Sequence, residues 1–252
     1  MSPVICLALF LATPVPNASQ IVERSVANTN RDWAAAAQFS FTERDLIVKN
    51  GVKTVKTYRD EMLDGSPYNK LLAINDEPLS GSAAAAEDRK LQREKIHRQN
   101  ESSTARQKRI SAYSRERRQD HALLSEMARA FDSKLVGEET VDGRQCYLLS
   151  ATPRPDYQPV SRDTKVLKGM RGRLWIDAKD YQWVKVQAEV FRPVTFGLFI
   201  AHVEPGTAFT LEERPLEGSL WLPLHFSVRV KAKVLMFPRN SLDEETYSDY
   251  RR

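Results

Sequence analysis

Strict alternation of polar and apolar residues constrains the fold of this chain more than any other feature. Between residues 225 and 234 the polar positions are His225, Ser227, Arg229, Lys231 and Lys233, and the apolar positions are Phe226, Val228, Val230, Ala232 and Val234. A period of two is typical of a β-strand with one solvated face and one apolar face. The fold must therefore bury one face of a sheet.

Residues 172–190 repeat this pattern around a short polar turn, which predicts a hairpin. The alternation places one set of residues on a common apolar face: Leu174, Ile176, Val184, Val186, Ala188 and Val190. Trp175 and Trp183 are expected on the opposite face. What the apolar face covers, an ordinary core or a cavity for an apolar ligand, is left open by the sequence.

Two further hairpins are predicted by turn dipeptides between alternating runs, Asn50-Gly51 and Asp142-Gly143. With a short helix over 21–33 and a last short strand over 247–250, the chain has about ten strands. So many strands favour curling over a flat sheet. We predict an α+β fold, mainly antiparallel β, in which a curved half-open β-barrel is covered by helices.

A long basic segment over 82–129 interrupts the strands and has helical composition, without Gly or Pro. Between residues 89 and 118 it holds eleven basic residues against three acidic ones. One interpretation is a solvated helical excursion that packs firmly only at its C-terminal end. The other is a contact for anionic headgroups or an acidic partner, through Arg89, Arg93, Arg98, Arg106, Arg109 and Arg117.

The apolar run over 4–12, followed by a possible cleavage site after Ala18, is typical of a secretory signal peptide. A buried N-terminal strand is the alternative. We therefore expect residues 1–18 to be a signal peptide, residues 19–252 to form one domain with the insertion, and the mature chain to be periplasmic. Cys146 would then remain alone, as a small core residue.

Catalytic motifs such as GxSxG, HExxH, GxxxxGK[ST] and CxxC do not occur, and the four His residues are isolated. We expect no enzyme activity, no cofactor and no metal. An enzyme whose active site is assembled from dispersed residues is an alternative hypothesis. The formal charge of +5 is compatible with anionic partners. Nucleic acid is not expected, because no aromatic residues alternate with the basic ones.

Several phrases resemble exported bacterial proteins related to the outer-membrane lipoprotein-sorting (LolA/LolB-like) superfamily. They are "DGSPYNKLLAINDEPLS", "LVGEETVDGRQCYLLSATPRPDYQP", "GRLWIDAKDYQWVKV", "GSLWLPLHFSVRV" and "TYSDYRR". The resemblance covers residues 21–252. It implies a half-open curved antiparallel sheet with helices over its mouth, which encloses an apolar cavity for acyl chains. The basic insertion departs from the smaller carriers of that superfamily.

The leading hypothesis is a monomeric carrier that holds a lipid or an acylated lipoprotein in an apolar cavity. An acyl chain gains about 0.8 kcal/mol for each methylene that leaves water, so such binding needs no catalytic group. The residues expected to line the cavity are Leu174, Ile176, Val184, Val186, Val190, Phe226, Val228 and Val230. The alternative is an envelope interaction module with a filled core, whose basic helix contacts an acidic partner or a membrane surface.

Overall fold

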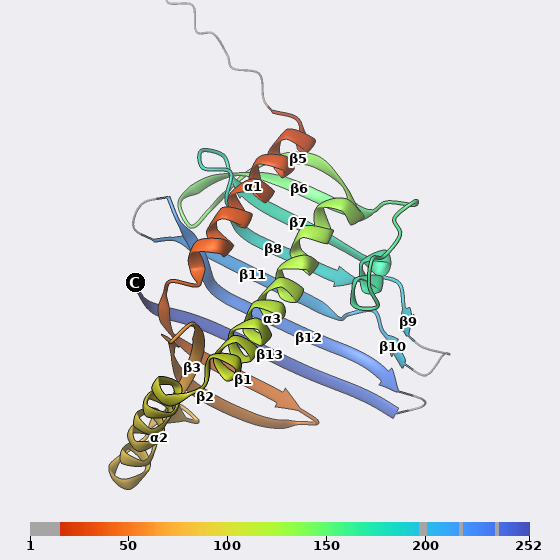
Figure 1. The fold of residues 1–252 in the computed structure, drawn as a ribbon. Coiled ribbons are helices and arrows are strands. Elements are labelled where there is room, and N and C mark those ends of the chain that lie inside the picture. Colours follow the sequence, from red (N-terminus) through yellow and green to blue (C-terminus); the bar gives the residue numbers. More distant parts are fainter. Residues whose placement is uncertain (1–15, 197–200, 217–218, 235–236) are drawn as a thin grey trace, which may run out of the picture.

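The computed structural model describes residues 16–252 apart from 197–200, 217–218 and 235–236. Figure 1 shows a broad sheet with long helices across one of its faces and another helix beside one end of it. The helices are α1 (Ala18–Ala36), α2 (Gly81–Asn100), α3 (Ser103–Ala130) and the short 3-10 helix η1 (Asp163–Gly169).

All strand pairs between the named strands are antiparallel, and eleven strands follow one another in the order β4-β3-β2-β1-β13-β12-β11-β8-β7-β6-β5. Two short strands lie off this path: β10 pairs with β12, and β9 pairs with β10. The bounds are β1 (Ser40–Lys49), β2 (Val52–Leu63), β3 (Ser66–Ile74), β4 (Glu77–Pro78), β5 (Phe131–Val141), β6 (Arg144–Pro153), β7 (Met170–Asp177), β8 (Trp183–Val190), β9 (Val194–Phe196), β10 (Ala201–Val203), β11 (Ala208–Pro215), β12 (Trp221–Val234) and β13 (Phe237–Arg251).

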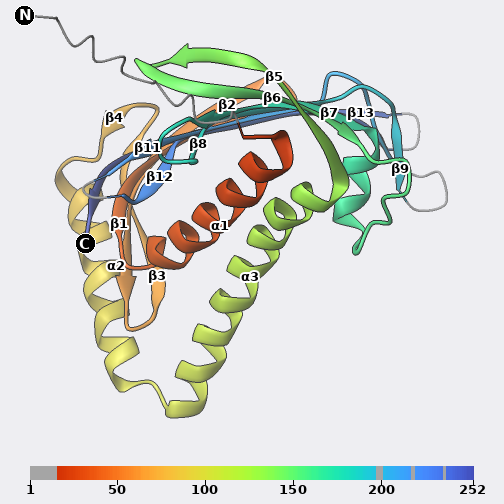
Figure 2. The ribbon, with the colours of Figure 1, turned by 90° about the horizontal axis from the view of Figure 1, so that it is seen from above.

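The sheet bends around α1 without closing, because β4 and β5 are its two ends and do not pair with each other. Figure 2 shows α1 and α3 on the concave side of this curved sheet. The predicted fold class is therefore confirmed: the chain is an α+β protein with a large, open antiparallel sheet and several helices.

Helix α1 begins at a capping box, in which the Asn17 side chain accepts a hydrogen bond from the Gln20 backbone and the Gln20 side chain accepts one from the Asn17 backbone. This pairing satisfies backbone N–H groups that the first turn leaves free. Residues 1–15, which hold most of the predicted signal peptide, lie outside the described residues. None of the described helices is apolar over a stretch long enough to cross a bilayer.

The basic insertion forms the helical hairpin of α2 and α3, close to the predicted bounds of 82–129. The expectation that only its C-terminal end packs firmly is wrong. Leu91 of α2 is buried, and so is Arg98, whose guanidinium donates to the carbonyls of Leu63, Ser66 and Pro67 at 2.7–3.1 Å. The N-terminal part of the insertion is thus bound to the β2–β3 turn.

The last strand is much longer than the predicted 247–250. Strand β13 covers fifteen residues and pairs with β12 on one side and β1 on the other. Its sequence is polar and lacks clear alternation, so the period-two signal misses most of it. Hydrogen bonds to two neighbouring strands stabilise it instead. One of them, β12, directly precedes β13 in the sequence, and the other, β1, lies near the N-terminus.

Candidate functional site

The strand register shows which residues share the concave face, because directly opposite residues on paired strands point to the same side. One row crosses ten strands: Leu135, Leu149, Leu174, Val186, Leu211, Phe226, Glu245, Asp45, Lys56 and Ile74. Ile21 of α1 packs against the apolar end of this row, which identifies the row as helix-facing. The row changes from apolar to charged between β12 and β13.

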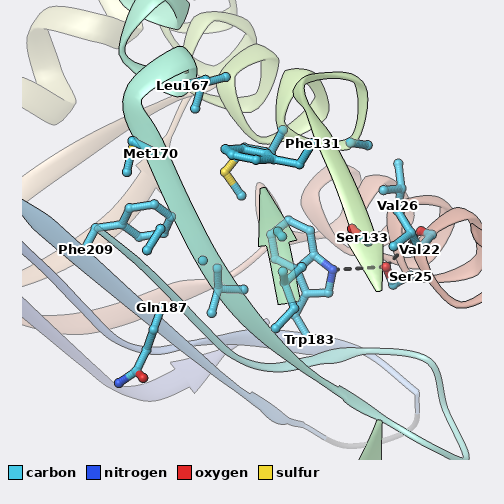
Figure 3. A pocket seen from close by; sticks show the side chains of 17 residues that line it. Val22, Ser25, Val26, Phe131, Ser133, Leu167, Met170, Trp183, Gln187 and Phe209 are labelled. Atoms are coloured by element: carbon cyan, nitrogen blue, oxygen red, sulfur yellow. Dashed lines mark hydrogen bonds between the residues drawn. The ribbon is translucent and has the colours of Figure 1, made fainter. Parts of the chain in front are cut away.

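We call the concave side of β5, β6, β7, β8, β11 and β12 the apolar half. Between it and the helices lies a cavity of about 40 Å³. Figure 3 shows Phe131, Met170, Trp183 and Phe209 around this space. Its lining residues are Val22, Ser25, Val26, Met127, Ala128, Phe131, Ser133, Ala151, Leu167, Met170, Gly172, Leu174, Trp183, Val186, Gln187, Ala188 and Phe209.

Small residues on β6, β7 and β8 account for the hollow. Ala151, Gly172 and Ala188 are directly opposite one another on β6, β7 and β8, and Phe209 continues the row on β11. A Cβ on Gly172 would lie 2.8 Å from the backbone oxygen of Gln187. Glycine is therefore required there by the close approach of β8, and the three small residues have no large side chain to fill the space.

Helix α1 closes the cavity on the side opposite the sheet. Val22 and Val26 line it, and Trp183 Nε1 donates to Ser25 Oγ at 3.2 Å, as drawn in Figure 3. Asp32 is buried and fixes the other end of the helix: its Oδ2 accepts from Gln182 Nε2 at 2.6 Å and from the Trp221 backbone N–H at 3.0 Å. Helix α1 is thus tied to the β7–β8 and β11–β12 turns.

Helix α3 packs against α1 through aromatic and polar contacts. The rings of Trp33 and His121 stack with centroids 4.2 Å apart, and the Arg117 guanidinium lies 4.5 Å from the Trp33 ring centroid. His121 Nε2 is 2.7 Å from Asn30 Oδ1. Burial and the positive charge of Arg117 lower the pKa of His121. The two helices together form the cover of the cavity.

A surface groove of about 490 Å³ adjoins the cavity near the N-terminal end of α1. It shares Val22, Val26 and Phe131 with the cavity lining, together with Ala128 and Ser133. Its rim carries charged residues, namely Glu23, Asp132 and Arg154. The apolar interior therefore meets the surface at a place where a polar group could remain in water.

The neighbouring part of the concave face has the opposite character. We call it the acidic half and define it by five carboxylates on β1, β2 and β13: Glu43, Asp45, Asp60, Asp243 and Glu245. Tyr247 and Tyr58 lie directly opposite Glu43 on either side, which places these residues on one face. Only Asp60 among the five is buried, and the others are half-exposed.

Burial and the charges of neighbouring carboxylates raise the pKa values of four of these groups, namely Glu43, Asp45, Asp60 and Glu245. Burial, followed by the charges of Asp60, Glu245, Asp45 and Asp243, raises the pKa of Glu43 to about 8. Burial raises the pKa of Asp60 to about 6, although Arg59 opposes the change. At the border with the apolar half, burial and the nearby Asp32 raise the pKa of Glu213 to about 8.

The structure brings together seven of the eight residues expected to line a cavity. Leu174 and Val186 line the hollow itself, whereas Ile176 and Val190 are fully buried in the packed core beside it. The β12 residues Phe226, Val228 and Val230 share the concave face but lie outside the cavity lining. Their role in ligand binding stays a prediction.

The placement of Val184 is corrected. A bulge makes Trp175 pair with Lys185 and Ile176 pair with Trp183, so Val184 is an extra residue on β8. Trp183 therefore joins Ile176 on the concave face, and Val184 packs with Trp175 and Cys146 on the other. If strict alternation is continued through residue 183, it places Val184 on the concave face and Trp183 on the opposite face, and both assignments are wrong.

The six arginines expected to contact headgroups fall into two groups. Arg98, Arg109 and Arg117 are used inside the protein: Arg98 binds carbonyls of the β2–β3 turn, Arg109 binds Glu101 and Ser66, and Arg117 donates to the Trp33 carbonyl. The buried Arg98 cannot also reach an external headgroup. The other three are exposed: Arg89, Arg93 and Arg106.

Sequence reasoning missed most of the cavity lining. Val22, Val26 and Met127 come from helices, and Leu167 comes from η1. The only sequence signal for them is that α1 and the end of α3 carry apolar residues at helical spacing. Within the described part of the chain, no three His, Cys, Asp or Glu residues converge as a metal site would require.

Comparisons with known proteins rest on structure alone, since no family model and no curated protein sequence matches this chain. A DUF1329 family protein from Desulfovibrio piger is 14% identical, with 92% of this chain and 91% of that one covered and a TM-score of 0.37. A LolA superfamily protein from Nitrosomonas europaea is 10% identical, with 94% of each chain covered and a TM-score of 0.35.

A third match is a complex of MucA and MucB from Pseudomonas aeruginosa. It is 13% identical, covers 90% of this chain and 98% of that chain, and has a TM-score of 0.25. These matches extend over most of the chain and include the superfamily that the sequence resembles. At such low identities and TM-scores we take no functional argument from them.

Proposed function

We propose that the protein is a non-catalytic binding protein or carrier for an acyl chain, which enters between the helices and the apolar half. The observation that carries the proposal is an apolar cavity that lies over Ala151, Gly172 and Ala188 of the sheet and is closed by α1 and α3, next to a groove at the surface. The acyl chain of a lipid or of an acylated lipoprotein is the ligand that fits this chemistry. The N-terminal apolar run supports a periplasmic location.

The closed form holds much less than an acyl chain. A cavity of about 40 Å³ compares with the roughly 150 Å³ that accommodates benzene in an engineered protein. Uptake therefore requires α1 and α3 to move away from the sheet. Each methylene then transferred from water gains about 0.8 kcal/mol, which offsets the cost of separating the helices from the sheet.

A cavity-filling variant tests this proposal. In Ala188→Leu the new side chain enters the hollow, so uptake of a fluorescent fatty acid should fall strongly. Thr152→Leu is the matched control, because Thr152 is exposed on β6 and lies outside the cavity lining. Circular dichroism verifies folding of both variants. Equal uptake by the two variants, or no uptake by the native protein, would refute the acyl-binding proposal.

The small volume of the cavity favours a second candidate, an interaction module with a filled core. In that case the exposed Arg89, Arg93 and Arg106 contact an acidic partner or surface. Deleting the whole insertion is a poor test, because Leu91 and Arg98 pack on the sheet. Reversing the three exposed charges to Glu should instead abolish binding to polyaspartate, while Ala188→Leu should leave that binding unchanged.

A further inference from the structure

A second pocket, of about 270 Å³, lies at the opposite end of α1 from the groove. It is formed by the residues that follow α1, by β1, β2 and β3, and by the middle of α3. The residues that matter for its chemistry are Phe39, Phe41, Asp60, Asn69, Tyr113 and Arg117. It shares no lining residue with the apolar cavity.

Asp60 is the unusual residue of this pocket. Asp60 is only 6% exposed, and its Oδ2 atom is buried without a hydrogen-bond partner among the described residues. A buried carboxylate without partners is costly to maintain. Asp60 lines the pocket directly, so a ligand there can supply the missing donor.

The groups around Asp60 include an aromatic ring, a further carboxyl group and two guanidinium groups. Phe41 lies directly opposite Asp60, and Glu43, two residues further along β1, belongs to the same face. Two guanidinium groups lie near Asp60, and each donates to a backbone carbonyl: Arg59 Nη1 donates to that of Asp249 at 3.2 Å, and Arg117, which lines the pocket, donates to that of Trp33. The pocket lining holds two carboxylates, Asp60 and Glu61, against the one guanidinium of Arg117, and an external cation would balance the remaining negative charge.

The walls of the pocket are aromatic. Phe39, Phe41 and Tyr113 contribute rings to its lining, and aromatic faces attract ammonium and guanidinium groups. Hard metal ions prefer several converging oxygen ligands, whereas no three candidate ligands converge in the described part of the chain. An organic cation fits the carboxylate and the rings better than a metal ion does.

We propose that this pocket binds an organic ammonium group, with Asp60 as its counter-ion and Phe41 and Tyr113 as its aromatic walls. A volume of about 270 Å³ accommodates a small molecule or one headgroup. The ammonium group can belong to a free small amine or to the headgroup of an amine-containing phospholipid.

Calorimetry with choline, ethanolamine and putrescine tests the first source, and vesicles of phosphatidylcholine or phosphatidylethanolamine test the second. Binding to either set should weaken by about tenfold or more in Asp60→Asn, which keeps the shape and removes the charge. Asp156→Asn is the matched control, at an exposed aspartate outside the pocket. Tyr113→Leu should weaken choline binding by about threefold or more.

Binding of free amines that depends on Asp60 supports a soluble amine as ligand. Binding of the amine-headgroup vesicles alone, with none to phosphatidylglycerol, supports a lipid headgroup. The proposal is overturned if the native protein binds none of these probes, if Asp60→Asn binds them as well as the native protein does, or if only a lysine-rich peptide binds. The fatty-acid uptake of Asp60→Asn should equal that of the native protein, which separates this test from that of the acyl-binding proposal.

Discussion

The apolar half and the acidic half belong to one sheet and are connected by the same row of opposite residues, yet they interact with the helices differently. Ile21 of α1 packs against Leu149, Ile176 and Trp183 in the apolar half. The carboxylates of the acidic half remain half-exposed except for Asp60. The strand register decides which residues share the concave face, whereas side-chain chemistry decides which part of it the helices cover.

The two halves contribute to the stability of the fold in opposite directions. Burial of apolar surface under α1 stabilises the fold and leaves a small hollow. Grouping carboxylates on the other half opposes folding, because burial and repulsion disfavour their charged forms. Stability alone therefore does not explain the composition of the acidic half, whereas the binding of a cationic ligand would explain it.

The largest effect is expected where α1 is fixed over the apolar half. Asp32→Ala leaves the buried Gln182 amide and the Trp221 N–H without their acceptor. The free energy of unfolding, measured with urea, should fall by about 3 kcal/mol. Arg31→Ala removes only the half-exposed partner of Asp32 and should cost less than about 1 kcal/mol. Equal small losses would show that α1 is not needed to stabilise the apolar half.

A core truncation measures how tightly the apolar half is packed. Leu149 is fully buried, so Leu149→Ala should lower the free energy of unfolding by about 2–3 kcal/mol and enlarge the hollow. Val228→Ala, in the half-buried row beside the acidic half, should cost about 1 kcal/mol. If the two variants lose the same stability, the distinction between a packed half and an open half fails.

The acidic half predicts a stability that falls as pH rises. The folded chain holds the Glu43 proton up to a pKa of about 8, whereas the unfolded chain releases it near 4.5. The folded state therefore binds more protons between these values, and stability declines across that window. Asp60, with its pKa raised to about 6, adds to the decline between about 4 and 6.

Glu43→Gln should remove part of this decline and gain about 1 kcal/mol at pH 9, after allowance for solvent screening. Urea unfolding at a series of pH values measures the effect. Glu138→Gln, on the exposed part of β5, is the control and should follow the native curve. A native curve that is flat or rises between pH 5 and 8 would contradict the pKa values assigned to the acidic half.

The smallest effect on stability is expected in the basic hairpin, which belongs to neither half. Arg89→Glu combined with Arg93→Glu changes two exposed residues and should alter stability by less than about 0.5 kcal/mol. Co-sedimentation with phosphatidylglycerol vesicles at low salt should nevertheless weaken. The pair Lys134→Glu and Lys165→Glu changes the net charge equally at other exposed sites. If both pairs weaken vesicle binding equally, only the overall charge matters.

Much of the fold could be predicted because its signals are local. Asn50-Gly51 and Asp142-Gly143 both occupy turns with positive φ between paired strands, as the dipeptides indicate. The helix at 21–33 and the helical insertion follow from composition and spacing. The bulge at Val184 has no such signal, because it is set by pairing with β7, and it reverses the face of Trp183.

Local patterns in the sequence are enough to specify antiparallel strands with one apolar face, because alternation and turn residues act over a few positions. The packed sheet, in contrast, places β13 between β12 and β1, which gathers Glu43, Asp60 and Glu245 on one face. It also brings Ala151, Gly172 and Ala188 together under α1 and leaves a hollow. Pairings between residues so distant along the chain depend on the whole sheet, and no local pattern specifies them.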